Sequence, residues 1–126
     1  MTLRTIFLLA TAAAMLVPAV AAAQAAGAAK VPAAVAAGSY GCWAHGSARM
    51  LLNFKVTGAN TYSGSKGNGS FNYDKASGKI GFKGGHLDGV LPDGFVTVYH
   101  EPHGKPTVSF RNARGGEVSF CERAGK

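Results

Sequence analysis

Residues 66–85, KGNGSFNYDKASGKIGFKGG, decide the fold class. In the first half of this stretch, Phe71 and Tyr73 occupy alternate positions. In the second half, Ile80 and Phe82 do the same, with lysines on the opposite side. Because alternation of apolar and polar residues is typical of a half-buried strand, the stretch predicts two strands joined by a short turn, a β-hairpin.

The hairpin contains the residues that tight turns require. Asp74 can accept hydrogen bonds from the turn, and Gly78 can adopt a positive φ where the chain enters the second strand. Gly84 and Gly85 end that strand. The glycines of the preceding link are expected to be turn residues too: Gly64, Gly67 and Gly69.

A similar sequence pattern continues on both sides of the hairpin, from residue 39 to the end of the chain. Short runs of aromatic and β-branched residues alternate with glycines, which is typical of many short strands. The predicted strands are residues 39–45, 49–56, 60–63, 70–73, 79–83, 94–100, 106–111 and 117–122. The clearest is 49–56, RMLLNFKV, in which one side is predicted to face the core. The residues on that side are Met50, Leu52, Phe54 and Val56.

No convincing helix is predicted in this region, so the fold class is all-β. About eight short strands with hairpin-length links favour a small antiparallel meander closed as a barrel. A two-sheet β-sandwich is the alternative. The two cysteines, Cys42 and Cys121, predict one disulfide in an exported chain. Such a bond would place the first strand beside the last, as a closed barrel requires.

The N-terminal part has a different composition. Residues 1–23 combine Arg4, an apolar run and a final trio of alanines, which is the layout of a secretory signal peptide cleaved before Gln24. Residues 24–38 are mostly Ala, Gly, Val and Pro, and are predicted to be a spacer. Residues 39–126 are expected to form a single disulfide-closed β domain, periplasmic or extracellular. After cleavage, no segment is long and apolar enough to span a membrane.

The chain is basic, with 13 Lys and Arg against 6 Asp and Glu, so loss of Arg4 with the signal peptide leaves +6. This charge favours polyanionic partners, such as an anionic envelope polymer or surface. The candidate contacts are Lys66, Lys75, Lys79 and Lys83. Residues 66–73 have the outline of an RNA-recognition signature, but Asn68 and Ser70 replace two stacking aromatics, so specific nucleic-acid binding is not expected.

Three histidines are candidate metal ligands: His86, His100 and His103. The spacing His100-x-x-His103 is suitable for zinc. Because the segment HEPHG is expected to be a turn, the two rings need not converge, and no metal or other cofactor is predicted. The chain also lacks a nucleotide phosphate loop and a Gly-x-Ser-x-Gly motif. No catalytic residues are therefore predicted, and the chain is not expected to be an enzyme.

The hairpin and the cysteines together make a longer pattern: Phe71-x-Tyr73-Asp74-x-x-x-Gly78-x-Ile80-x-Phe82-x-Gly84-Gly85-x-Leu87, flanked by Cys42 and Cys121. With this pattern the chain resembles small exported bacterial antiparallel β-domain proteins of unassigned function. The resemblance covers most of residues 39–126. It implies a secreted or periplasmic β domain and brings no catalytic residues.

We expect from these observations a non-enzymatic binding or envelope-associated module. One alternative is a small barrel that binds an apolar ligand, similar to lipocalins in general plan, with some of the aromatic residues lining a pocket. A further alternative is a metal-dependent enzyme that uses the three candidate histidines.

Overall fold

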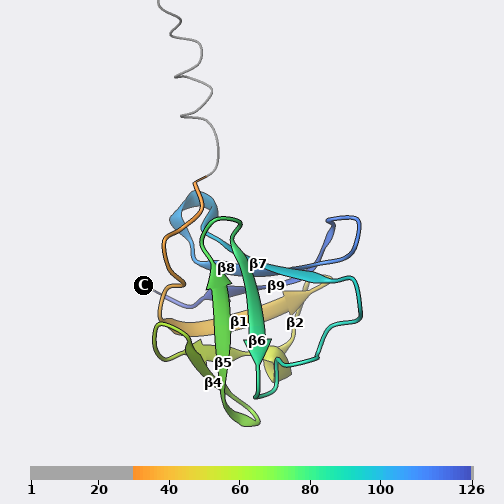
Figure 1. Cartoon of the computed structure of the whole chain (residues 1–126). Coiled ribbons are helices and arrows are strands. Elements are labelled where there is room, and N and C mark those ends of the chain that lie inside the picture. The colour runs from red at the N-terminus through yellow and green to blue at the C-terminus, as the bar shows by residue number, and fades with distance from the viewer. Residues whose placement is uncertain (1–29, 126) are drawn as a thin grey trace, which may run out of the picture.

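A closed β-barrel forms the domain (Figure 1). The computed structural model describes residues 30–125, so the predicted signal peptide and residues 24–29 of the predicted spacer lie outside the described residues. The barrel closes because β1 (Gly38–Ala44) pairs with β3 (Phe54–Val56) and also with the last strand, β9 (Glu117–Arg123). The predicted all-β barrel is confirmed, and the two-sheet sandwich is not the fold.

The other strands follow one another around the barrel in chain order, each antiparallel to its neighbours. They are β4 (Thr61–Gly64), β5 (Gly67–Asp74), β6 (Lys79–Lys83), β7 (Val96–His100) and β8 (Thr107–Arg111). A short extra strand, β2 (Ser47–Ala48), pairs with the end of β1. Two 3-10 turns complete the described part of the chain, η1 (Met50–Leu52) and η2 (Pro102–Gly104).

The disulfide lies where the barrel closes. Cys42 of β1 and Cys121 of β9 are directly opposite in the ladder and are bonded to each other. Both are buried, at 2% and 0% exposure. The predicted disulfide is confirmed, and it links the first barrel strand to the last.

Aromatic rings fill the interior. Phe54 stacks on Tyr40 with ring centroids 4.9 Å apart and meets the edge of Tyr62 at 6.2 Å. The pleat points alternate residues of each strand inward, and an eight-stranded barrel is just wide enough for such side chains to fill. The largest fully buried rings are those of Tyr40, Tyr62, Tyr99, Phe71 and Phe110. The interior is therefore packed with side chains.

The β5–β6 hairpin has the predicted turn. The Asp74 carboxylate accepts hydrogen bonds from the Ala76 N–H (3.0 Å) and the Ser77 hydroxyl (2.8 Å). Gly78 has a φ of +83°, which a side chain would strain. The four apolar residues of the two strands face the core as predicted.

The link before β5 differs from the prediction. Its turn is residues 65–66, so Gly69 lies inside β5 and not in a turn. A Cβ on Gly69 would lie 2.5 Å from the Gly84 carbonyl oxygen and 2.5 Å from the Tyr62 ring. Only glycine fits at this position, because the Gly84 backbone and the Tyr62 ring both approach it closely.

The predicted strand at residues 49–56 is wrong in its first half, because η1 replaces it and β3 begins only at Phe54. Asn53 explains the break. Its side-chain oxygen accepts the Cys42 N–H at 2.9 Å, in place of a backbone carbonyl of a continuous strand. The alternation predicts a buried Met50, but Met50 is 75% exposed.

Part of the predicted spacer packs against the barrel (Figure 1, orange). The Tyr73 hydroxyl donates to the Pro32 carbonyl, and the Tyr40 hydroxyl donates to the Ala36 carbonyl, each at 2.6 Å. Val35, which lies between Pro32 and Ala36 in the chain, is buried, at 7% exposure. Val35 and Ala36 therefore add to the core.

All four tyrosines have raised pKa values because burial disfavours the charged phenolate. Burial raises the pKa of Tyr40 to about 12. For Tyr99, burial is again the larger cause, and the hydrogen bond that its hydroxyl donates to Glu101 raises the pKa further. The pKa values of Tyr62 and Tyr73 are also raised, chiefly by burial.

We expect the folded protein to show little tyrosinate absorbance at about pH 10, where an unperturbed tyrosine is half ionised. Since the unfolded chain releases these protons more readily, the contribution of the four tyrosines to stability should be constant below about pH 10 and be lost as the pH rises above it. An ultraviolet titration checks this, with the same titration in denaturant as the control. Reversible ionisation of the tyrosines near pH 10 with the fold intact would contradict the burial.

Candidate functional site

The four candidate lysines do not form one cluster. Lys66 precedes β5 and Lys75 follows it, which separates them by about 30 Å at about 3.3 Å per residue. Lys79 and Lys83 are the end residues of β6, and Lys79 is opposite Asp74 in the ladder. Exposed charges farther apart than about 10 Å are largely screened at moderate salt. The four lysines therefore cannot act as a single anion site.

Charge is distributed unevenly along the chain. Asp74 is the first acidic residue, and the 6 Asp and Glu all lie from there onward. Residues 74–125 carry seven Lys and Arg against these six acids. Residues 30–73, by contrast, have four basic side chains and no acidic one. We call this segment, which runs from Lys30 through most of β5, the basic half. Its cations are Lys30, Arg49, Lys55 and Lys66.

Two apolar side chains project into solvent within the basic half. Met50 is 75% exposed and Leu51 is 82% exposed, and both belong to η1. Met50, Lys55 and Ser65 line the same open hollow of about 500 Å³. We call the two residues the Met50/Leu51 corner. Three basic residues are associated with it: Arg49 precedes Met50 in the chain, Lys55 lines the hollow, and Lys66 follows the lining residue Ser65.

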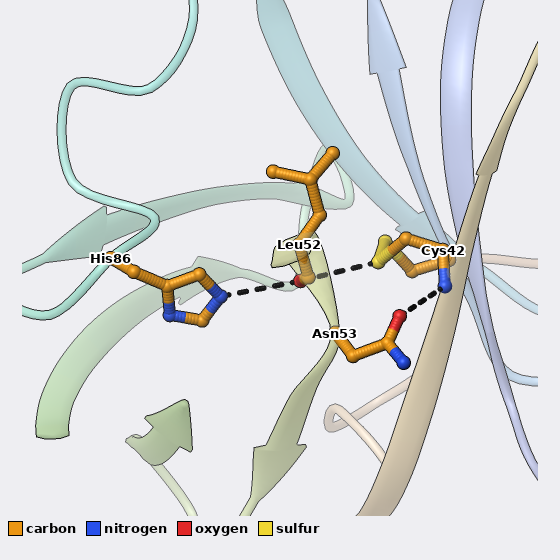
Figure 2. Close-up of a disulfide and its surroundings, with 5 residues drawn as sticks. Cys42, Leu52, Asn53 and His86 are labelled. Carbon is orange, nitrogen blue, oxygen red and sulfur yellow. Dashed lines mark hydrogen bonds between the residues drawn. A yellow bond between two sulfur atoms is a disulfide. The ribbon is translucent and has the colours of Figure 1, made fainter. Parts of the chain in front are cut away.

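Hydrogen bonds hold this corner against β1 (Figure 2). The Arg49 N–H donates to the Cys42 carbonyl at 2.7 Å, and the Asn53 side chain accepts the Cys42 N–H at 2.9 Å. From the other side, His86 Nε2 donates to the Leu52 carbonyl at 3.3 Å. The corner is therefore a fixed turn, tied to the residue that carries the disulfide.

His86 is a packing residue of this turn. A Cβ on Gly64 would lie 2.0 Å from the His86 ring, so the ring fits only because Gly64 has no side chain. The Leu52 carbonyl also lies 3.3 Å from the Cys42 sulfur, which has no hydrogen to donate in a disulfide. His86 Nε2 therefore supplies the proton to that carbonyl. Among the described residues, His86 Nδ1 is buried without a hydrogen-bond partner.

The three candidate histidines occupy separate elements. His86 lies in the β6–β7 link, His100 ends β7, and His103 lies in η2. Within residues 30–125, no group of three or more His, Cys, Asp or Glu side chains is arranged to hold a metal ion. The described part of the structure thus gives the metal-enzyme alternative no site.

His100 belongs to a short chain of hydrogen bonds on β7, β8 and β9. His100 Nε2 donates to Ser109 Oγ at 2.7 Å, and the Ser109 hydroxyl donates to Glu117. Burial lowers the pKa of His100, and the nearby Arg111 charge lowers it further. A catalytic serine would instead give its proton to the imidazole and face the substrate. Ser109 is fully buried, so the chain of bonds is structural.

A larger hollow lies beside β6 and β7. These strands pair at one position, Lys79 with Val98, and then diverge. An open groove of about 690 Å³ follows the divergence, beneath the β6–β7 link. Its larger apolar lining residues are Ile80, Phe82, Leu87, Leu91 and Phe95. The hairpin pattern predicts the inward direction of Ile80 and Phe82, but it contains no information on how far β7 lies from β6.

Arg49 and Lys55 are not among the predicted contact residues, because the alternation of residues 49–56 explains them as the solvent side of a strand. The signal that identifies them is in the sequence: no Asp or Glu precedes Asp74. The exposure of Met50 has no such local signal, since it depends on the bond between Asn53 and Cys42.

No family model, curated protein or solved structure matches this chain. The resemblance to small exported bacterial β domains therefore stays a prediction. Among residues 30–125, no helix has the length and apolar character needed to cross a membrane.

Proposed function

We propose that this chain is an exported binding module without catalytic activity, which attaches to an anionic polymer or surface through its basic half. The observation that carries the proposal is the absence of any acidic side chain in residues 30–73, where Arg49, Lys55 and Lys66 are all exposed. Charge of a single sign over one part of a surface attracts polyanions and increases their rate of association. The non-catalytic role draws on the sequence, which has no nucleophile motif.

The cations of the basic half are available for such contacts. Within the described residues, the one ion pair joins Lys105 to Glu122 at 3.4 Å, and it lies outside the basic half. Glu122 of β9 lies opposite Gly41 of β1 in the ladder, so this pair also offsets an acidic charge beside β1. Each cation held near an anionic surface contributes about 1 kcal/mol at low salt.

Export is supported by the disulfide at the closure of the barrel, because structural disulfides persist in oxidising compartments. N-terminal sequencing of protein recovered from outside the cytoplasm tests this part. The expected first residue is Gln24. Protein that keeps Met1 and has two free thiols in its host cell would contradict export.

Retention on an immobilised polyanion, eluted with increasing salt, tests the attachment. K55Q/K66Q should elute at clearly lower salt than the unmodified protein, because both changes remove charge from the basic half. K79Q/K83Q is the matched control: it removes the same charge from β6, where Asp74 is nearby, and should shift elution less. Equal shifts for the two variants, or retention that salt does not weaken, would contradict the proposal.

The second candidate function is capture of a small apolar ligand in the β6–β7 groove. Its volume of about 690 Å³ is within the range of ligand pockets, and its larger side chains are apolar. The buried rings occupy the barrel interior, so a ligand would bind beside the barrel and not within it as in a lipocalin plan. Native mass spectrometry of exported protein checks this candidate. A co-purified apolar molecule supports it, and repeated recovery of the bare chain counts against it.

A further inference from the structure

The Met50/Leu51 corner has no role in the stability of the fold that would explain its composition. Both side chains are mostly in solvent, at 75% and 82% exposure, while the third residue of η1, Leu52, packs against the core. Exposed apolar side chains are common singly, whereas Met50 and Leu51 are adjacent and form a small apolar patch on a fixed turn. The bonds from Cys42 to Arg49 and Asn53 hold the turn in place, so little conformational freedom would be lost on binding.

The surroundings of the corner favour lipid over other partners. A standard protein interface buries about 800 Å² on each partner, far more than two side chains offer. A soluble polyanion has no apolar phase into which Met50 and Leu51 could move. An anionic bilayer offers both an apolar interior and negative headgroups, and the corner combines its two apolar side chains with Arg49, Lys55 and Lys66.

Trp43 is another exposed apolar side chain, in the hairpin that leads into η1. It follows Cys42 in β1, pairs with Ala48 of β2, and is 42% exposed. Tryptophan is enriched where protein surfaces meet the membrane–water interface. The hairpin that leads into η1 therefore carries a side chain suited to the headgroup region.

We infer that the Met50/Leu51 corner inserts into the outer part of an anionic lipid bilayer, while the neighbouring cations contact the headgroups. The inference rests on the proposed attachment to anionic surfaces and names the lipid bilayer as that surface. The corner supplies the apolar part of the binding, and the basic half supplies the part that salt weakens.

The test uses co-sedimentation with vesicles of phosphatidylcholine and phosphatidylglycerol, and compares M50S/L51S with the unmodified protein. Removal of two apolar side chains from the site of insertion should weaken vesicle binding at least about tenfold. Retention on a soluble polyanion should be unchanged, since no charge is altered. V90S is the control, because Val90 is an exposed apolar residue that lines the β6–β7 groove and not the corner, and this variant should bind vesicles normally.

The outcomes separate this inference from the proposed function. If M50S/L51S binds vesicles as well as the unmodified protein does, the corner does not insert. If a dimer of the unmodified protein becomes a monomer in M50S/L51S, the corner contacts a second copy of the chain and the inference is wrong. If the unmodified protein binds neither vesicles nor polyanion, the proposed function itself fails. Both substituted residues are exposed, so unfolding is not expected, and circular dichroism checks the fold.

Discussion

Replacement of both cysteines, in C42A/C121A, should lower the free energy of unfolding by about 4 kcal/mol. The bond connects residues 79 positions apart, and its removal frees nearly the whole domain in the unfolded state. Small domains have only about 5–15 kcal/mol of total stability, so the loss is a large fraction. Urea unfolding followed by circular dichroism measures it.

Reducing agent provides the control for this variant. It should destabilise the unmodified protein by a similar amount and leave C42A/C121A unchanged. The alanine variant should lose slightly more, because Cys42 and Cys121 are both buried and the lost sulfurs leave space. A loss below about 1 kcal/mol would show that the β1–β9 ladder closes the barrel without the covalent bond.

Truncation of Tyr62, in Y62A, is the second large effect, with an expected loss of about 3–5 kcal/mol. Tyr62 is fully buried, and its ring meets Phe54 and Phe82 edge-on. Its hydroxyl donates to the Gly84 carbonyl and accepts the Leu87 N–H at 3.1 Å. The side chain therefore joins the interior packing to the start of the β6–β7 link.

Y62F separates the two contributions. It keeps the ring and removes the hydroxyl, which leaves two backbone groups without their partner, so we expect a loss of about 1–3 kcal/mol. Denaturant unfolding of Y62A and Y62F side by side measures both. Equal losses in the two variants would show that the hydroxyl, and not ring packing, accounts for the effect, and would contradict a tightly packed interior around Tyr62.

Strands whose side chains alternate were predictable from sequence because the alternation is local. β6 has the predicted bounds, and β8 and β9 lie within one residue of theirs. The turn at Asp74 and Gly78 was predictable for the same reason, since its hydrogen bonds join residues at most four apart. The two cysteines indicated the closure of the barrel because each lies in a terminal strand.

The errors have long-range causes. Residues 49–56 alternate well enough for a strand, but the bond from Asn53 to Cys42 is made between separate elements and overrides the pattern. Gly69 is explained by the approach of Gly84 and Tyr62, which no local rule contains. The divergence of β6 from β7, and hence the groove, likewise depends on the whole barrel.

The candidate site was predictable in its charge but not in its position. Lysines on the hairpin indicated an anionic partner, yet the structure spreads them over the length of β5 and β6. Arg49 precedes Met50 in the chain, but Lys55 shares a hollow with Met50 only because η1 interrupts the predicted strand. A pattern can show which residues are charged, but the barrel determines which of them lie close together.

The most direct test of the binding surface is an amide NMR titration of the protein with small phosphatidylglycerol-containing bicelles. We predict that the largest shifts will occur in residues 49–55 and 63–68, which surround the Met50/Leu51 corner and its hollow. Added salt should reduce these shifts. Shifts concentrated in residues 87–97, along the β6–β7 groove, would contradict the account and favour the apolar-ligand candidate.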